Sequence, residues 1–168
     1  MIINPTVKAM PLFNKLEKVA EAEAAKVYCA ENPFYSWHAH YTTINRKKVL
    51  FLVNDLTLLT IVIQDVNAQN KKYLDEMIRD RIRYLLKSFG FEQEKLDKYY
   101  RHMDDIQIYK GHSRSITTII NKNIMYTEDL EYDEYYWAEA MDICNNIIVS
   151  TIGYNNPIEK TIEVFETY

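Results

Sequence analysis

Glycine is scarce in this chain. Only Gly90, Gly111 and Gly153 occur among 168 residues, and they lie far apart. A GxGxxG turn or a Walker A loop needs clustered glycines that bring backbone N–H groups close to a phosphate. Nucleotide binding by either motif is therefore excluded.

Cysteine is rarer still. Cys29 and Cys144 are the only two, and neither belongs to a CxxC motif or to a Cys/His cluster, so no cysteine-based zinc site is encoded. With four histidines in the whole chain, we also expect no transition metal and no cofactor. Both thiols are expected to stay reduced and to pack as small hydrophobic groups.

Long apolar runs are missing. The longest strongly apolar stretch covers residues 49–53, far short of the roughly 20 residues that cross a bilayer. The first residues, MIINPTVKAMPLF, contain neither the basic segment nor the apolar segment of a secretory signal. We expect a cytoplasmic protein that does not insert into a membrane.

Neither sign of charge dominates the chain. Lys and Arg total 20 and Asp and Glu total 24, a net charge of −4 that is spread along the sequence. A nucleic-acid partner is therefore not expected. A composition of 48% hydrophobic and 26% charged residues is that of an ordinary globular protein. Without a linker, repeat or low-complexity segment, residues 1–168 are predicted to form a single domain.

Alternating and apolar segments predict a β-sheet. A brief strand at residues 1–4 precedes Pro5, which lacks an N–H group. Further strands are predicted at 37–44, 49–53 and 57–64. The corners between these three are too short for a parallel crossover, so they predict an antiparallel meander. A strand at 105–110 is expected to extend that meander.

Helical spacing of apolar residues occupies most of the remaining chain. Helices are predicted at 11–30, 70–89, 92–102, from Ser113 or Ser115 to Ile124, at 133–152, and from Pro157 onward. Asn156 is the expected N-cap of the last helix, with Pro157 as its first residue. The predicted fold is α+β, an antiparallel sheet of about four to five strands covered by helices, with a helix-rich C-terminal half.

Two histidines stand two positions apart on the predicted strand 37–44. Strand alternation places His38 and His40 on one face and Trp37 and Tyr41 on the other. Asp55 or His112 could supply a further metal ligand, but an H-x-H pair is only weakly specific. A structural or solvated role and a catalytic role remain alternatives to metal binding.

The segment KGHSRS, residues 110–115, joins a predicted strand to a predicted helix. Its glycine, hydroxyls, cation and imidazole lie where free N–H groups at a helix start attract an anion. Arg46 could add positive charge if its hairpin corner lies at the same end of the sheet. In the alternative interpretation, Ser113 or Ser115 is an ordinary N-cap worth about 1 kcal/mol, and the basic residues are solvated.

Aromatic residues cluster at 132–137. Tyr132, Tyr135 and Trp137 could contact a protein partner. The alternative is a half-buried helical seam, because Tyr136 falls on the apolar stripe of the predicted helix.

Several short segments resemble an uncharacterised bacterial domain-of-unknown-function family: MIINPT, WHAH, INRKKVLFLVNDLTL, HSRS and IGYNNPIE. None is a known catalytic signature, so the resemblance implies a small bacterial cytosolic protein and leaves the activity open. The family's pattern often has Asn where this chain has His40. That difference speaks against a metal site, since Asn does not replace an imidazole ligand of zinc.

These observations lead to three functional hypotheses. The first is a non-enzymatic binding or regulatory module whose polar pocket holds a small anionic ligand or a peptide carboxylate. The residues expected in that pocket are Trp37, His38, Arg46, Asn54, Asp55, His112, Ser113, Arg114 and Ser115. The second is a hydrolase or phosphodiesterase in which His38 or His112 is the general acid/base, while Arg46 and Arg114 stabilise negative charge. The third is a protein-interaction partner that uses the aromatic cluster.

Overall fold

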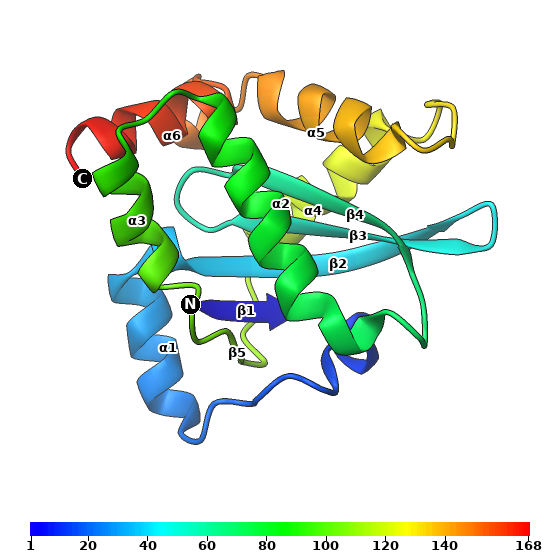
Figure 1. The fold of residues 1–168 in the computed structure, drawn as a ribbon, viewed down its shortest axis with the longest axis horizontal. Coiled ribbons are helices and arrows are strands. Elements are labelled where there is room, and N and C mark those ends of the chain that lie inside the picture. Colours follow the sequence, from blue (N-terminus) through cyan, green and yellow to red (C-terminus); the bar gives the residue numbers. More distant parts are fainter.

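A computed structural model describes residues 1–168 and shows one five-stranded sheet with helices on both faces (Figure 1). The strands are β1 (Ile2–Pro5), β2 (Ser36–Ile44), β3 (Lys47–Asn54), β4 (Thr60–Val66) and β5 (Gln107–Ile108). The helices are α1 (Ala22–Glu31), α2 (Leu74–Ser88), α3 (Gln93–Arg101), α4 (Arg114–Tyr126), α5 (Tyr136–Asn146) and α6 (Pro157–Glu166). The α+β class predicted from the sequence is confirmed.

The sheet is mixed rather than antiparallel throughout. Its order is β4-β3-β2-β1-β5, and β2, β3 and β4 form the predicted antiparallel meander. However, β1 runs parallel to both β2 and β5, so the prediction of an entirely antiparallel sheet is wrong in this respect. Residues 6–35, which include α1, separate β1 from β2 and are long enough for a parallel crossover.

The helix predicted at residues 11–30 is only partly present. A single 3-10 turn covers Met10–Phe13, and α1 begins at Ala22. Between them the chain is extended beside β5, where Ile108 N donates to Glu17 O at 2.8 Å and Val19 N donates to Ile108 O at 3.0 Å. Because β5 would otherwise expose unpaired backbone groups at the sheet edge, these bonds outweigh the helical propensity of the segment.

Local side-chain hydrogen bonds set several other boundaries. β4 starts later than predicted because Asn54 Oδ1 accepts hydrogen bonds from Leu56 N and Thr57 N, both at 3.1 Å, and folds these residues into a turn. The predicted caps of α4 and α6 are confirmed, with Ser113 Oγ and Asn156 Oδ1 accepting from backbone N–H groups in the first helical turn. The helix predicted at 133–152 is shorter in the structure, where α5 covers Tyr136–Asn146. It ends there because the backbone of Ile147 is extended.

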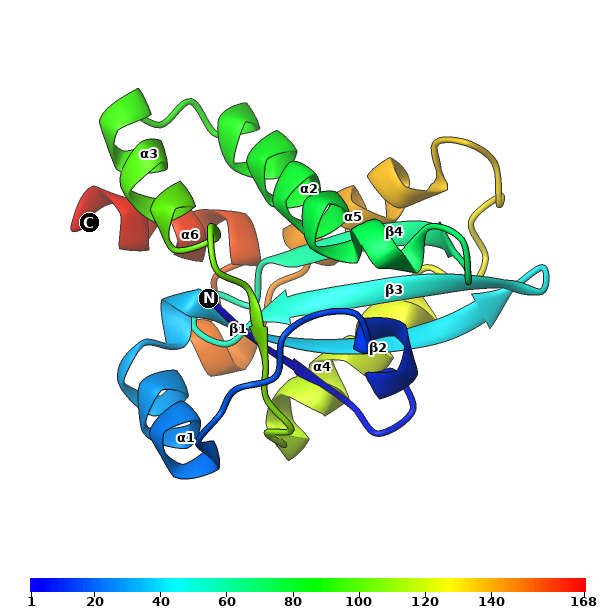
Figure 2. The same cartoon turned by 60° about the horizontal axis from the view of Figure 1, so that its bottom comes forward.

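The helices divide between the two faces of the sheet. Figure 2 shows α2 and α3 on one side and α1 and α4 on the other. Trp37 faces α3, where its Nε1 donates to Tyr99 Oη at 3.3 Å. His38 and His40 face the opposite side, as the strand alternation predicted. His38 therefore lies on the face that α1 and α4 cover.

One apolar cluster of 36 buried residues includes side chains from both faces of the sheet. None of the helices has both the length and the apolar character that a membrane crossing requires.

Candidate functional site

The candidate site is built around a close pair, His38 and Asp55. His38 Nδ1 lies 2.6 Å from Asp55 Oδ1, and the imidazole is almost completely buried, with 6% of the residue exposed. β2 carries His38, and Asp55 follows β3 immediately. Asp55 N also donates to Ser36 O at 2.9 Å, which holds the turn after β3 against the start of β2.

Ser36 and Asn4 extend this pair into a chain of hydrogen bonds. Ser36 Oγ donates to Asp55 Oδ2 at 2.5 Å, and Asn4 Nδ2 donates to Ser36 Oγ at 3.1 Å. Asn4 and Ser36 are buried and lie on the same sheet face as His38, because β1 pairs in parallel with β2 in this register. The two oxygens of the Asp55 carboxylate are thus held by different partners.

This arrangement assigns the proton positions. A carboxylate only accepts, so His38 Nδ1 carries a hydrogen and donates it to Asp55. In a ring that carries only this proton, the Nε2 atom presents a lone pair. It is buried and has no hydrogen-bond partner in the protein. Since leaving a buried polar atom unpaired costs about 1–3 kcal/mol, this nitrogen is the atom of the site whose pairing with a water or a ligand atom would stabilise the protein most.

His38 lines a small cavity between β1, β2, α1 and the segment before α4. The cavity has a volume of about 200 Å³ and is lined by Asn4, Lys26, Cys29, His38, Tyr109, Gly111 and His112. Lys26 and His112 are exposed at its rim, whereas Asn4 and His38 form its buried part. The cavity thus combines cationic or titratable groups at the entrance with a buried imidazole inside.

Gly111 forms part of the wall through a close approach of the backbone to Asn4. A Cβ atom at this position would overlap Asn4 Oδ1 and would lie 3.1 Å from Asn4 Cγ. Both atoms belong to the Asn4 side chain, whose Nδ2 is held by Ser36 Oγ at 3.1 Å and Trp37 O at 3.3 Å. The glycine is therefore required here by space.

A larger groove of about 560 Å³ lies elsewhere along α1, lined in part by Tyr28, Arg101, His102 and Asp105. The His102 ring stacks on Tyr35, with centroids 3.7 Å apart. None of the side chains lining this groove has a buried polar atom without a partner. We therefore take the smaller cavity at His38 as the candidate site, despite its size.

The structure brings three of the predicted pocket residues together: His38, Asp55 and His112. Trp37 and Asn54 lie at the same end of β2 and β3 as His38, but their side chains point to the other face of the sheet. Asn54 is a structural residue whose Nδ2 donates to Phe34 O at 2.9 Å. Their prediction as pocket residues is wrong, because adjacent positions in a strand point to opposite faces.

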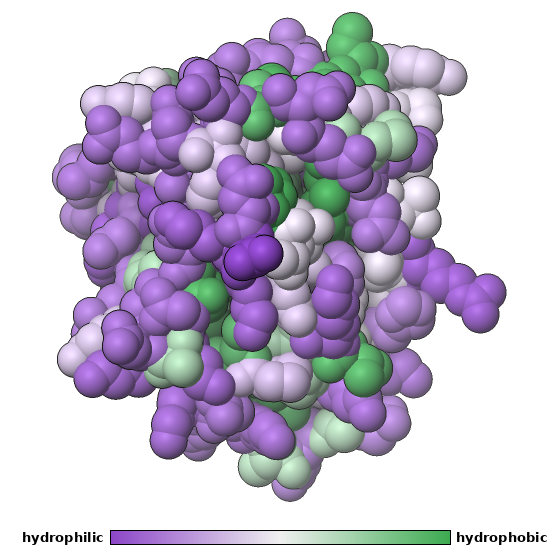
Figure 3. Space-filling model, turned by 90° about the vertical axis from the view of Figure 1, so that its right-hand side faces the viewer, coloured by the Kyte–Doolittle hydropathy of each residue, from purple (hydrophilic) through white to green (hydrophobic).

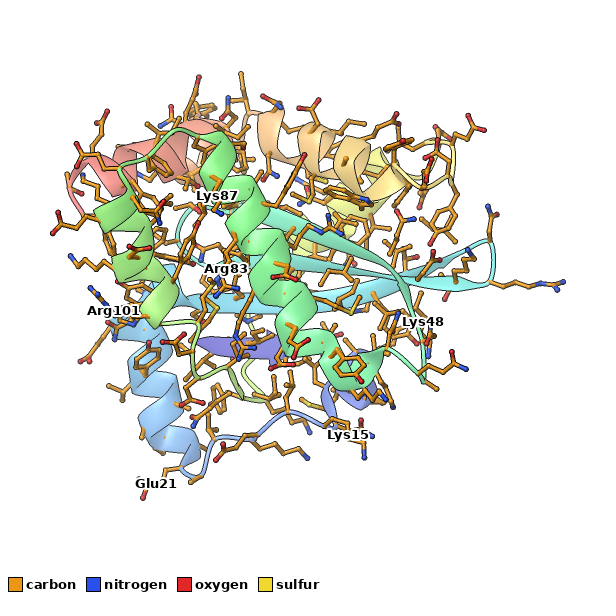
Figure 4. The ribbon with its side chains drawn as sticks, in the orientation of Figure 1. Lys15, Glu21, Lys48, Arg83, Lys87 and Arg101 are labelled. Carbon is orange, nitrogen blue, oxygen red and sulfur yellow. The ribbon has the colours of Figure 1, made fainter.

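Arg46 does not lie near the pocket. It occupies the tip of the β2–β3 hairpin, and His38 pairs with Val53 at the opposite end of the same two strands. Figure 4 shows the labelled Lys48 toward the hairpin end and Arg101 at the other end of the molecule. The face seen from the hairpin end is largely hydrophilic (Figure 3). The expected contribution of Arg46 to the pocket is therefore wrong.

Residues of the KGHSRS segment have two different roles: some line the cavity and one caps helix α4. Gly111 and His112 line the cavity, whereas Ser113 Oγ accepts from Ile116 N at 3.4 Å and lies 3.0 Å from Ser115 Oγ. Arg114 is exposed in the first turn of α4 and does not line the cavity. The N-cap interpretation thus holds for Ser113.

Sequence reasoning missed four residues that line the cavity, Asn4, Lys26, Cys29 and Tyr109. It also missed Ser36, which donates to Asp55. Ser36 carried a signal, because it lies two positions before His38, directly ahead of the predicted strand 37–44, and an extended backbone there places both on one face. Asn4 and Cys29 carried none, since their proximity depends on the parallel pairing of β1 and on the position of α1.

The aromatic cluster does not form a common exposed patch. Tyr132 Oη donates to Asp65 Oδ1 at 2.8 Å, and the Trp137 ring is covered by the Arg81 guanidinium at 3.5 Å from its centroid. Only Tyr135 is well exposed, at 60%. The half-buried seam is thus the arrangement found for Tyr132 and Trp137.

His38 and His40 do not share a metal-ligand set. No group of three or more His, Cys, Asp or Glu side chains comes together in an arrangement that could hold a metal ion. His40 Nδ1 instead lies 2.6 Å from Thr6 Oγ1.

Fold and site together define an α+β protein with a buried Asp–His pair at a small polar cavity. The chain belongs to the domain of unknown function DUF6933, whose family model matches residues 2–160. The expectation of an uncharacterised domain family is confirmed. A search of curated proteins found no match.

Proposed function

We propose that the cavity at His38 binds a small anionic ligand such as a carboxylate, and that the protein is a binding module. The observation that supports this proposal most directly is that His38, one of the residues that line the cavity, has a buried Nε2 atom without a hydrogen-bond partner while its Nδ1 is held by Asp55. An oxygen atom of a ligand can satisfy this nitrogen.

The charges around the cavity favour a negative ligand that binds together with a proton. When Nε2 takes up a proton, it becomes a donor to a ligand oxygen, and Asp55 on the other side of the ring balances the positive charge. Lys26 and His112 at the rim attract an anion toward the entrance. A volume of about 200 Å³ restricts the ligand to a small molecule or to the terminal carboxylate of a peptide.

The other hypotheses have less support. A phosphodiesterase that uses Arg46 and Arg114 lacks both cations at the cavity. A protein partner at Tyr132, Tyr135 and Trp137 stays a prediction, as does the bacterial, cytoplasmic setting. Both cysteines are free thiols, as such a setting requires.

The proposal is tested by thermal unfolding in acetate, phosphate and chloride at matched ionic strength. A bound anion stabilises the fold by RT ln(1 + [L]/Kd), about 2.7 kcal/mol at a hundredfold excess over Kd. We expect this stabilisation in the wild type and its loss in His38→Gln.

His40→Asn is the matched control, because His40 is on the same strand and face but outside the cavity. It should keep the full anion-dependent stabilisation. Equal stabilisation of wild type and His38→Gln by acetate and by phosphate would show that the anion binds elsewhere. Calorimetry in two buffers with different ionisation enthalpies should in addition detect proton uptake on binding.

A further inference from the structure

The arginines of α2 differ in their partners. Arg79, Arg81 and Arg83 are the partly buried arginines of the chain. Arg79 donates to Asp75 at 2.7 Å, and an Arg83 nitrogen lies 3.7 Å from an Asp80 oxygen. Arg81 has neither an ion pair nor a hydrogen bond within the protein, and its Nε atom is buried without a partner. No direct contact with a carboxylate therefore compensates its charge.

Trp137 of α5 fixes the Arg81 guanidinium. Arg81 Cζ lies 3.5 Å from the centroid of the indole, and the Tyr84 ring packs edge-on against the same indole, with centroids 5.2 Å apart. At this contact α2 and α5 lie side by side next to β4 (Figures 1 and 2). Because a planar guanidinium stacked on an aromatic ring is pre-organised, it loses little conformational freedom when it binds a carboxylate.

The free donors of this cluster reach the surface. Arg81 Nη1, Arg81 Nη2 and Trp137 Nε1 form no hydrogen bond with the protein, and none of the three is buried. Tyr84 is 55% exposed. A guanidinium and an indole N–H only donate, so the group that fits them is an acceptor, and a carboxylate is the acceptor that pairs with both nitrogens of an arginine fork. Burial also lowers the pKa of Arg81, and a carboxylate there would oppose that effect.

An apolar hollow adjoins the cluster. It has a volume of about 210 Å³ and lies between α2, α5 and α6. Tyr84 lines the hollow and also packs on Trp137, so the hollow and the Arg81 cluster are continuous. The other apolar residues of its lining are Leu85, Phe89, Ala138, Met141 and Ile158. The hollow starts one turn beyond Arg81 on α2 and extends about 5–12 Å from it along the helix axis.

The charges nearby restrict the ligand. Gln64 Nε2 donates to Asp133 O at 3.0 Å and Gln64 Oε1 accepts from Trp137 N at 3.0 Å, so the loop before α5 ends beside this cluster. The acidic residues of that loop are all exposed, namely Glu128, Asp129, Glu131, Asp133 and Glu134. They repel a polyanion such as a nucleic acid, whereas a single carboxylate can approach Arg81.

We propose that Arg81, Trp137 and Tyr84, together with the adjoining hollow, form a docking surface for a segment of a partner protein. That segment carries one Asp or Glu, which pairs with Arg81, and one large apolar side chain one to two helical turns away, which fills the hollow. Arg, Trp and Tyr are the residues that most often dominate the binding energy of protein interfaces. The surface shares no residue with the His38 cavity, so it does not depend on the function proposed above.

The test selects peptides on phage against the full chain. The library contains random peptides of about 16 residues, long enough for about four helical turns. Counter-selection uses Arg81→Met, or Arg81→Lys if circular dichroism shows that Arg81→Met does not fold. We expect enriched peptides with one Asp or Glu and a large apolar residue one to two helical turns away.

Synthetic copies of the enriched peptides measure the contribution of Arg81. Arg81→Met should weaken their binding about 30-fold in fluorescence-anisotropy titrations, as for a hot-spot residue. Arg81→Lys keeps the charge without the fork and should also weaken binding. Arg83→Met, on the same helix but paired with Asp80, is the matched control and should bind as the wild type does.

The indole N–H signals locate the bound peptide. The chain has two tryptophans, and Trp37 is buried at 1% exposure, so a proton–nitrogen correlation spectrum contains one buried and one accessible indole signal. Trp137→Phe identifies the accessible one. The peptide should shift the Trp137 signal and leave the Trp37 signal in place.

The opposite results are equally clear. Enrichment of no peptide, enrichment of Lys-rich and Arg-rich peptides, or equal binding to the wild type and to both Arg81 variants overturns the docking surface. An unchanged Trp137 signal at saturation places the peptide elsewhere and overturns it as well. Tighter binding after the acidic residue of the peptide is replaced by phosphoserine contradicts a carboxylate partner and indicates a phosphorylated one.

Discussion

His38 and His40 stand two positions apart on one strand and on one face, yet their surroundings differ completely. His38 Nδ1 meets a carboxylate, whereas His40 Nδ1 meets the hydroxyl of Thr6 at 2.6 Å. The difference comes from Asp55, which the turn after β3 brings to the start of β2. A single residue type thus acquires a chemical role from its neighbours.

At the residue scale, Gly111→Ala tests how tightly the cavity wall is packed. The added methyl group overlaps Asn4 Oδ1, so the Asn4 amide must move from its bonds to Ser36 and Trp37 O. We expect a loss of about 1–3 kcal/mol in the free energy of unfolding, typical of overpacking, measured by urea denaturation. Lys110→Ala, at the exposed neighbouring position, should change it by less than about 0.5 kcal/mol. A neutral Gly111→Ala would show that Asn4 moves without cost.

At the scale of elements, both edges of the sheet form hydrogen bonds with segments that are not strands. Residues 17–19 pair with β5 at one edge. At the other edge, the Asn145 side chain of α5 pairs with the backbone of Thr60 in β4. Its Oδ1 accepts from Thr60 N at 2.7 Å and its Nδ2 donates to Thr60 O at 2.8 Å, as the backbone of a neighbouring strand would. These contacts leave neither edge with a fully open row of backbone groups.

The edge contact predicts a large effect of Asn145→Ala. Both Thr60 backbone groups are buried, and removal of the amide leaves them without this partner, so we expect a loss of about 2–3 kcal/mol in the free energy of unfolding. Asn146→Ala, the exposed next residue of the same helix, is the control and should have little effect. Similar losses in the two variants, by urea denaturation, would show that the effect does not come from the contact with Thr60.

At the scale of the whole molecule, two histidines make stability depend on pH. Burial lowers the pKa of His40 and of His102 below the usual 6.5, with Lys8 adding to the effect at His40. Below pH 6.5 the unfolded chain therefore binds more protons than the folded one, so the free energy of unfolding decreases as the pH falls. Above that pH this contribution is constant.

We expect urea denaturation between about pH 6.5 and pH 5 to show this decrease, before most carboxylates titrate. The double variant His40→Asn/His102→Gln should have a flatter profile than the wild type over the same range. A wild-type stability that stays constant or rises on acidification would contradict the assignment.

The sequence alone determined the elements whose signal is local. Helix α2 with its apolar stripe, the caps at Ser113 and Asn156, the meander of β2 to β4 and the facing of His38 follow from periodicity, capping chemistry and corner length. These features depend on residues only a few positions apart, where hydrogen-bond reach and strand alternation are fixed by covalent geometry. The Asp55–His38 pair was partly foreseeable, because both residues were candidates for one pocket.

Only the tertiary structure decided the rest. The parallel pairing of β1 brings Asn4 beside Ser36, and the crossover places Cys29 beside Asn4, although Cys29 and Ser36 are 25 and 32 positions from Asn4 in sequence. The extended course of residues 17–19 likewise follows from the open edge of β5 rather than from local propensity. Contacts between distant segments depend on which arrangement buries the apolar surface of the whole chain and pairs its buried polar groups, and no local pattern in the sequence encodes that choice.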